Sequence, residues 1–178
     1  MDAIEIMLKE YETLRQESLN SMHNRNTILS FGLAAIGAIF AGSIIAYSTD
    51  TYSLIPSLAL IIVIPLISSF ILLIWLGEYE RMQRAGRFLV GIEHRINKEF
   101  SKELLTWETR LRERRVHMRY PYYATVGLLI GISGILFGIG LVTADFSATL
   151  MRSVTIAGVI VHLGLYLFVT FRVSKLRL

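Results

Sequence analysis

Basic residues recur at helical spacing in the middle of this 178-residue chain. Four of them and a glycine follow one another at steps of three and four residues: Arg84, Arg87, Gly91, Arg95 and Lys98. A helix places residues with this spacing along one face. Guanidinium groups form bidentate contacts with phosphate, and nine of the eleven Lys and Arg residues between positions 77 and 121 are Arg. The pattern therefore predicts a binding site for an anion, which can be a nucleotide, an oligonucleotide or a phosphorylated partner.

The same segment predicts a second basic face and also offers a simpler explanation of its charge. Three further arginines complete the predicted ligand-binding set: Arg112, Arg115 and Arg119. Glu108 lies four residues before the first of them, at the spacing of a favourable helical pair. Residues 77–121 hold eleven basic and seven acidic side chains, a net charge of +4. In the simpler explanation, this charge marks the cytoplasmic side of a membrane and reaches toward anionic lipid headgroups.

A polar stripe occurs in the otherwise apolar segment 153–171. Its members share one helical face and are our candidates for a pore wall: Thr155, Gly158, His162 and Tyr166. Ionisable groups inside a membrane usually face protein or water and are often functional. His162 is therefore a candidate for a position sensitive to pH or ions. A histidine that is satisfied by one hydrogen bond to a neighbouring helix is the alternative.

Two further features of the apolar segments concern helix packing. Four glycines recur at steps of four, three and four: Gly127, Gly131, Gly134 and Gly138. Such a face predicts a close approach of two membrane helices, within or between subunits, with a glycine-lined pore as the alternative. Pro65 lies inside another apolar segment and removes a backbone hydrogen bond, so we expect a kink there, and a gating hinge if the protein is a channel.

Signatures of enzymes are missing from the sequence. It contains no cysteine, no Gly-rich phosphate loop, no metal-spaced set of His and carboxylates and no Gly-x-Ser-x-Gly elbow. Arg87 with His94 and Arg112 with His117 fit the loose spacing of certain ribonucleases, but chance accounts for such pairs in an arginine-rich segment. We therefore expect a protein that is not an enzyme and that has no metal and no cofactor.

The composition predicts an integral membrane protein. Hydrophobic residues make up 53% of the chain and its mean hydropathy is +0.54, more than a soluble domain of this length can bury. An apolar helix of about 20 residues crosses the hydrocarbon core of a bilayer. Four segments have that length and contain no Asp, Glu, Lys or Arg: 27–47, 54–76, 123–142 and 153–171. We predict an all-α fold with four transmembrane helices in two hairpins.

The distribution of Lys and Arg predicts the orientation. Of 18 such residues, 17 lie before the first span, between the second and third spans or after the fourth, and Arg152 is the exception. By the positive-inside rule, we expect both termini to lie in the cytoplasm. The predicted location of the protein is the inner membrane of a bacterium or archaeon. A charged, helix-like stretch precedes the first span, so we expect no removable signal peptide.

The predicted organisation has five parts. They are an amphipathic helix over 1–26, a transmembrane hairpin over 27–76, an Arg-rich cytoplasmic helical hairpin over 77–121, a second transmembrane hairpin over 122–172 and a tail over 173–178. The first helix is expected to pack on the cytoplasmic hairpin, or else to lie among the lipid headgroups.

Within the cytoplasmic hairpin, the apolar pattern continues the second span without a proline and breaks near Ser101. A second helix over 102–120 is predicted, with Leu104 and Trp107 among its inward residues. Pro121 is expected to separate that helix from the third span.

The layout resembles a family of bacterial membrane proteins. Two hairpins of spans, a basic cytoplasmic hairpin and the runs WLGEYER at 75–81 and LTWETRL at 105–111 resemble the small membrane effectors of nucleotide-regulated antiphage defence, of the type of the Hailong channel subunit. The resemblance implies an oligomeric channel that a nucleotide messenger opens or holds closed, and a partner enzyme that synthesises the messenger. It assigns no role to individual residues.

The leading functional hypothesis is a homo-oligomeric channel, with a tetramer as the first expectation. An anionic messenger would bind its basic face, and its opening would depolarise the membrane in antiphage defence. Its partners would be lipid, other copies of the chain, the messenger and the synthase, with no duplex nucleic acid. The main alternative is a membrane anchor or scaffold that docks a soluble partner through the cytoplasmic hairpin. A transporter would call for intramembrane acids, which the spans lack.

Overall fold

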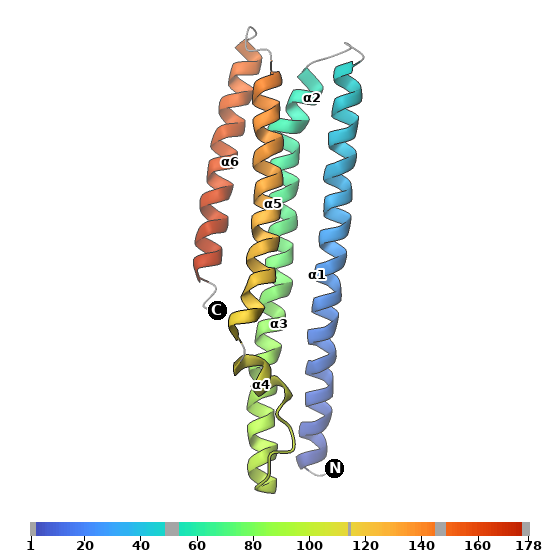
Figure 1. Cartoon of the computed structure of the whole chain (residues 1–178), viewed down its shortest axis with the longest axis vertical. Helices are drawn as coiled ribbons and strands as arrows, with labels where there is room; N and C mark the ends of the chain where they lie inside the picture. The colour runs from blue at the N-terminus through green and yellow to red at the C-terminus, as the bar shows by residue number, and fades with distance from the viewer. Residues whose placement is uncertain (1–2, 49–53, 114, 145–148, 176–178) are drawn as a thin grey trace. The chain divides into compact units, whose positions relative to one another are not determined.

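The computed structural model describes residues 3–48, 54–113, 115–144 and 149–175, and in this part of the chain the regular structure is entirely helical. Figure 1 shows the order of the helices. They are α1 (Ala3–Ser48), α2 (Leu54–Leu58), the π-helical turn η1 (Ala59–Val63), α3 (Ile64–Phe100), α4 (Trp107–Glu113), α5 (Arg115–Thr143) and α6 (Thr149–Lys175).

Four of these helical segments are long and apolar enough to span a membrane, as the sequence predicts. Their bounds are Ala3–Ser48, Ile55–Phe100, Tyr120–Thr143 and Arg152–Phe171. Large apolar side chains stand on their outer surfaces, among them Val142 at 87% exposure and Phe31 at 74%. Surfaces of this kind are costly in water.

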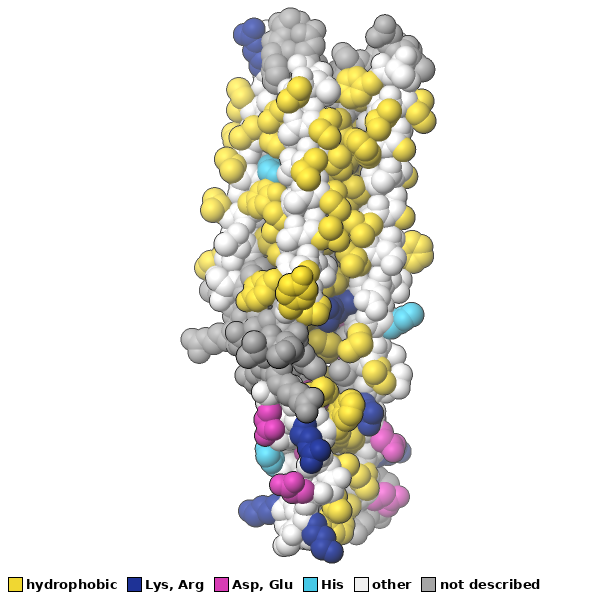
Figure 2. All heavy atoms as spheres, viewed as in Figure 1, with side chains coloured by type: hydrophobic (Ala, Val, Ile, Leu, Met, Phe, Trp, Pro, Cys, Tyr) yellow, Lys and Arg dark blue, Asp and Glu magenta, His cyan; other side chains and the backbone are white. Residues whose placement is uncertain are grey.

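The chain divides into two compact units. We call residues 1–27 with 75–122 the polar unit, and residues 28–74 with 123–178 the apolar unit. Charged side chains gather on the polar unit in Figure 2, whereas hydrophobic side chains cover the visible helices of the apolar unit. α1, α3 and α5 each contribute residues to both units.

The core of the polar unit joins the first part of α1 to the last part of α3. Tyr11 of α1 is buried against Leu89, Ile92 and Ile96 of α3, and Met7, Leu14 and Leu105 pack around them. The predicted packing of the N-terminal helix on this part of the chain is confirmed at Met7, Tyr11 and Leu14. No break separates that helix from the first apolar segment, because both belong to α1.

α3 ends where the sequence predicts a break. Ser101 has a φ of 49°, the left-handed conformation that commonly follows the last helical residue. Its N–H donates to the Lys98 carbonyl and the Lys102 N–H donates to the Asn97 carbonyl, each at 3.2 Å. This pair of bonds is the Schellman motif, which closes the end of the helix.

The chain after Ser101 differs from the prediction of one helix over 102–120. The Asn97 side chain accepts the N–H groups of Leu104 and Leu105 at 2.8 and 2.9 Å and donates to the Leu105 carbonyl at 2.6 Å. These bonds hold the segment before α4 in a non-helical path, so the helix begins at Trp107. The prediction that Leu104 and Trp107 point inward is wrong, since they are 56% and 60% exposed.

Pro121 does not separate two helices. It lies inside α5, which continues from Arg115 to Thr143. A proline removes one backbone hydrogen bond, and long helices in apolar surroundings tolerate that loss when neighbouring groups compensate. The third apolar segment therefore begins as the continuation of a helix that starts among the arginines.

In the apolar unit, a π-helical turn precedes Pro65. η1 ends at Val63, and the Ile64 N–H donates to the Ala59 carbonyl, five residues back. Glycines of two other helices approach this turn closely. A Cβ at Gly140 would lie 2.8 Å from the Leu60 Cβ, and a Cβ at Gly158 would overlap Ile61 Cγ2 and lie 3.2 Å from the Ile61 carbonyl oxygen. Both glycines therefore allow α5 and α6 to pack on η1.

The predicted glycine face of α5 makes fewer close contacts within the chain than Gly140 and Gly158 do. A Cβ at Gly127, Gly131 or Gly138 would meet no described atom within 4 Å, while one at Gly134 would lie 3.2 Å from the Tyr166 hydroxyl. The close helix contacts of this unit thus depend on Gly32, which faces Ile71, and on Gly140 and Gly158 rather than on the four-glycine pattern.

Candidate functional site

The basic face of α3 is exposed. The side chains of Arg84, Arg87, Arg95 and Lys98 are all exposed, and a Cβ at Gly91 would meet no described atom within 4 Å. None of these four basic side chains forms an ion pair with another described residue. A free row of guanidinium and ammonium groups can bind an anion, because no internal carboxylate competes for them.

The packing of the opposite, apolar face of α3 explains why the basic face is exposed. Leu89, Ile92 and Ile96 are between 2% and 6% exposed and pack against Tyr11 of α1. Burying an apolar side chain contributes about 1.5–3 kcal/mol, so packing on α1 fixes the rotation of α3. The basic residues then necessarily occupy the solvent side.

A buried carboxylate, that of Glu93, joins three segments of the polar unit. Its Oε1 accepts the Tyr11 hydroxyl at 3.0 Å and the Glu108 N–H at 2.9 Å. Its Oε2 accepts the Thr109 N–H at 2.9 Å and the Thr109 hydroxyl at 2.7 Å. Glu93 is fully buried. It therefore satisfies backbone N–H groups in the first turn of α4 that have no partner within the helix.

These bonds govern the protonation of Glu93. Burial acts to raise the pKa of the Glu93 carboxyl, but the donors from Glu108, Thr109 and Tyr11 together hold this pKa below its usual value. Burial, followed by the hydrogen bond to Glu93, raises the pKa of Tyr11 to about 12. Glu93 is therefore ionised and Tyr11 is neutral at neutral pH.

α4 packs closely on α3 through Gly86. A Cβ at Gly86 would overlap the Glu108 carboxylate and would lie 3.2 Å from an Arg112 guanidinium nitrogen. The same guanidinium donates to the Gln83 carbonyl at 3.1 Å. Burial raises the pKa of Glu108, the neighbouring Arg112 charge opposes this shift, and Glu93 adds to it. Arg112 thus takes part in holding α4 on α3.

The seven predicted ligand residues are therefore not all on one surface. Arg84, Arg87, Arg95 and Lys98 share the exposed face of α3, whereas Arg112 contacts the backbone of α3 elsewhere. Arg115 and Arg119 belong to α5, but their side chains lie outside the described residues. We define the basic face by the four residues of α3.

An arginine is enclosed by aromatic rings in the polar unit. The Arg25 Cζ lies 4.4 Å from the ring centre of Trp75 and 5.2 Å from that of Tyr79. Tyr122 packs on both rings, with centroids 5.7 Å from Trp75 and 4.7 Å from Tyr79. The cation–π contacts join α1 to α3, and the ring contacts of Tyr122 join α5 to α3.

In the apolar unit, the predicted stripe of α6 faces other helices of the unit. Gly158 packs on η1. The His162 ring stacks on Phe137 with centroids 4.6 Å apart, and the Tyr166 ring meets it edge-on at 4.4 Å. The Tyr166 hydroxyl donates to the Ile130 carbonyl at 2.7 Å, and Thr155 has a buried hydroxyl without a partner among the described residues.

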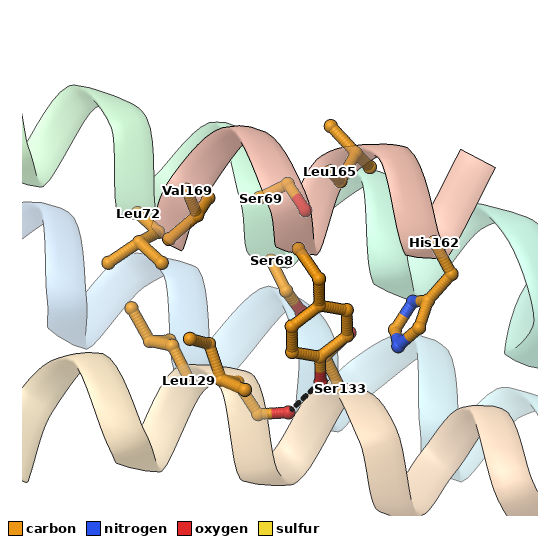
Figure 3. A pocket seen from close by; sticks show the side chains of 10 residues that line it. Ser68, Ser69, Leu72, Leu129, Ser133, His162, Leu165 and Val169 are labelled. Atoms are coloured by element: carbon orange, nitrogen blue, oxygen red, sulfur yellow. Dashed lines mark hydrogen bonds between the residues drawn. The ribbon is translucent and has the colours of Figure 1, made fainter. Parts of the chain in front are cut away.

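Tyr166 and His162 also line a small cavity of ≈ 20 Å³ between α3, α5 and α6, shown in Figure 3. Ser68 and Ser69 of α3 and Ser133 of α5 supply further hydroxyl groups to its wall. Pro65 is not in the wall, but its carbonyl accepts the Ser69 hydroxyl at 2.8 Å. The cavity thus has polar groups on three helices in otherwise apolar surroundings.

Reasoning from the sequence missed Glu93, Arg25 and Gly140. An indication of Glu93 was available, because this acid falls beside Leu89, Ile92 and Ile96 on the apolar side of the predicted helix. A carboxylate there must find donors or be neutral. Which donors it finds depends on α4 and α1, which are remote in the sequence.

Comparison with protein-family models, curated proteins and solved structures finds no match to this chain.

Proposed function

We propose that the chain is the subunit of a homo-oligomeric membrane channel that is regulated by a phosphate-bearing anionic ligand at the basic face of α3. The observation that carries this proposal is the exposed row of Arg84, Arg87, Arg95 and Lys98 on a helix that also contributes an apolar span. A ligand that shifts the end of such a helix acts directly on the residues inside the membrane.

The proposed topology has both termini and the polar unit in the cytoplasm of a bacterium or archaeon, with the four spans forming two hairpins. The concentration of Lys and Arg outside the spans supports it. Gly127, Gly131 and Gly138 on α5, where an added Cβ would meet no described atom within 4 Å, support assembly from several copies, because a second helix can approach such a face closely.

The ligand is proposed to be a nucleotide or oligonucleotide messenger that a partner enzyme supplies, and channel opening is proposed to depolarise the membrane in antiphage defence. Guanidinium groups form bidentate contacts with phosphate, so exposed arginines favour a phosphate-bearing ligand over a neutral one. The messenger and the defence role follow from the family resemblance described above and add to the charge argument.

The test is a measurement of membrane potential in cells that express the chain together with its candidate partner enzyme. We expect Arg84→Glu/Arg87→Glu to change the depolarisation without altering the amount of protein in the membrane fraction. Lys9→Glu/Lys102→Glu is the matched control, since it makes the same change of net charge at exposed positions of the polar unit. Equal effects of the two double variants would contradict a specific role of the basic face.

A membrane scaffold is the second candidate, and exposed apolar side chains of the polar unit favour it. Phe88 is 65% exposed and Trp107 is 60% exposed, which is typical of contact surfaces for proteins. Stoichiometric co-purification with a soluble partner that Phe88→Ser abolishes, and an absence of current in reconstituted bilayers, would favour the scaffold over the channel.

A further inference from the structure

The cavity between α3, α5 and α6 has an unsatisfied polar group in its wall. Ser68 is 3% exposed, and its hydroxyl has no hydrogen-bond partner among the described residues. Two other serines of the apolar unit donate to the carbonyl one turn back: Ser69 donates to Pro65 and Ser43 donates to Ile39, both at 2.8 Å. A buried hydroxyl without a partner destabilises the fold, because it has lost its hydrogen bonds to water. Ser68 therefore lies where a partner from outside the chain would be favourable.

The size and lining of the cavity define what that partner is. Its volume of ≈ 20 Å³ exceeds the roughly 10–15 Å³ that one water molecule requires. Polar groups of α5 and α6 line it as well, namely Ser133, His162 and Tyr166. Because the Tyr166 proton is used on the Ile130 carbonyl, its oxygen can still accept a hydrogen bond. A buried water typically makes two to four hydrogen bonds, which these groups can supply.

A cation of similar size is disfavoured by the charge of the site. None of the residues that line the cavity is acidic, and the four predicted spans contain no Asp or Glu. A sodium or potassium ion there would lose its hydration without gaining a compensating negative charge, which is very costly in apolar surroundings. Hydroxyl groups and an imidazole ring suit a neutral molecule that both donates and accepts hydrogen bonds.

We propose that this cavity is a binding site for one water molecule, which accepts from Ser68 and links α3 to α5 and α6 through hydrogen bonds inside the apolar unit. Polar links between helices define their association where lipid surrounds the bundle, because apolar contacts with lipid and with protein are similar in strength. The proposal stands whether or not the protein is a channel.

The test uses the full chain in lipid nanodiscs, with ¹³C-labelled methyl groups of Leu and Val, and magnetisation transfer from water. Leu72 and Leu129 line the cavity and are 2% and 1% exposed, so bulk water cannot reach their methyl groups. We expect water cross-peaks at both. Leu60 and Leu76 are equally buried, at 1% each, but do not line the cavity. They serve as matched controls and should show none.

Two variants complete the test. Ser68→Val fills the cavity with apolar atoms and should abolish the cross-peaks at Leu72 and Leu129. Should this variant fail to fold, Ser68→Ala, which removes the hydroxyl without adding volume, should weaken them. Absence of the cross-peaks from the unmodified protein would overturn the proposal, and so would their saturable loss on adding sodium chloride but not choline chloride, which would indicate a cation site.

Discussion

At the residue scale, the Glu93 carboxylate joins segments that are remote in the sequence. It receives four hydrogen bonds, from Tyr11 of α1 and from Glu108 and Thr109 of α4. Hydrogen bonds to a charged acceptor contribute about 1.5–3 kcal/mol each before the cost of burying the charge is subtracted. The carboxylate thus holds α4 and the first part of α1 on α3.

Glu93→Gln should destabilise the polar unit at neutral pH by about 1–3 kcal/mol, because an amide accepts fewer of these bonds. The pKa of Glu93 is lowered in the folded state, so its contribution is present above the ordinary carboxyl pKa of 4.5 and is lost as the pH falls through the lower folded value. Thermal unfolding followed by near-UV circular dichroism at pH 7 and at pH 3 measures this difference. The exposed Glu99→Gln change is the control and should have no effect at either pH.

Glu108→Gln should have the opposite effect and should stabilise the polar unit at neutral pH. The pKa of Glu108 is raised by burial, so the charged form is the less stable one in the fold, and stability falls as the pH rises through that pKa. We expect Glu108→Gln to unfold at a higher temperature than the unmodified protein at pH 7, and at the same temperature near pH 3. A loss of stability at pH 7 as large as that of Glu93→Gln would contradict the assignment of opposite roles to these two carboxyls.

At the element scale, the π-helical turn η1 is the surface on which α5 and α6 meet α3. Gly140 and Gly158 bring their helices against Leu60 and Ile61 so closely that a side chain has no room. A π-helical turn adds one residue to a turn of the helix, and such turns are frequent at functional sites. Here it lies directly before Pro65, where the sequence pattern predicts a kink.

Gly158→Ala should therefore destabilise the apolar unit, by about 1–3 kcal/mol, since the added methyl group would overlap Ile61. Gly164→Ala is the matched control on the same helix, because a Cβ there meets no described atom within 4 Å. It should leave stability unchanged or increase it by up to about 1 kcal/mol, the difference in helix propensity. Thermal unfolding of the two variants in detergent micelles measures this difference. A loss in Gly164→Ala equal to that in Gly158→Ala would show that the contact with η1 is irrelevant.

At the scale of the whole molecule, the four long apolar helices and the charged surface of the polar unit give the chain two chemically different parts. Apolar side chains as exposed as Val142 and Phe31 are stable only when lipid or another protein covers them. By the positive-inside rule, the concentration of Lys and Arg outside the spans predicts an orientation in the bilayer.

The predicted orientation can be tested directly because the chain has no cysteine. Single variants Thr51→Cys and Ser101→Cys place one thiol in each proposed compartment. With a membrane-impermeant maleimide, we expect labelling of Thr51→Cys in intact spheroplasts and of Ser101→Cys only after the membrane is permeabilised. Labelling in the reverse order would contradict the proposed position of both termini in the cytoplasm.

The sequence by itself determined the features that arise from local patterns. Apolar length and helical spacing predict four long apolar helices, the continuation of the second span to Phe100 and the break at Ser101, and the structure has each of them. The spacing of Arg84, Arg87, Arg95 and Lys98 likewise predicts a common face, which is exposed. Their ligand stays a prediction.

Only the tertiary structure decided the features that depend on which remote groups meet. The start of α4 at Trp107 follows from the Asn97 side chain and from Glu93, which lie on α3. No local sequence pattern indicates that α5 continues through Pro121. The same holds for the contacts of Gly140 and Gly158 with η1. A single lost hydrogen bond or a missing Cβ acquires its effect only from the neighbour that faces it. For the same reason, the polar cavity at His162 arises from three helices and is invisible in any one of them.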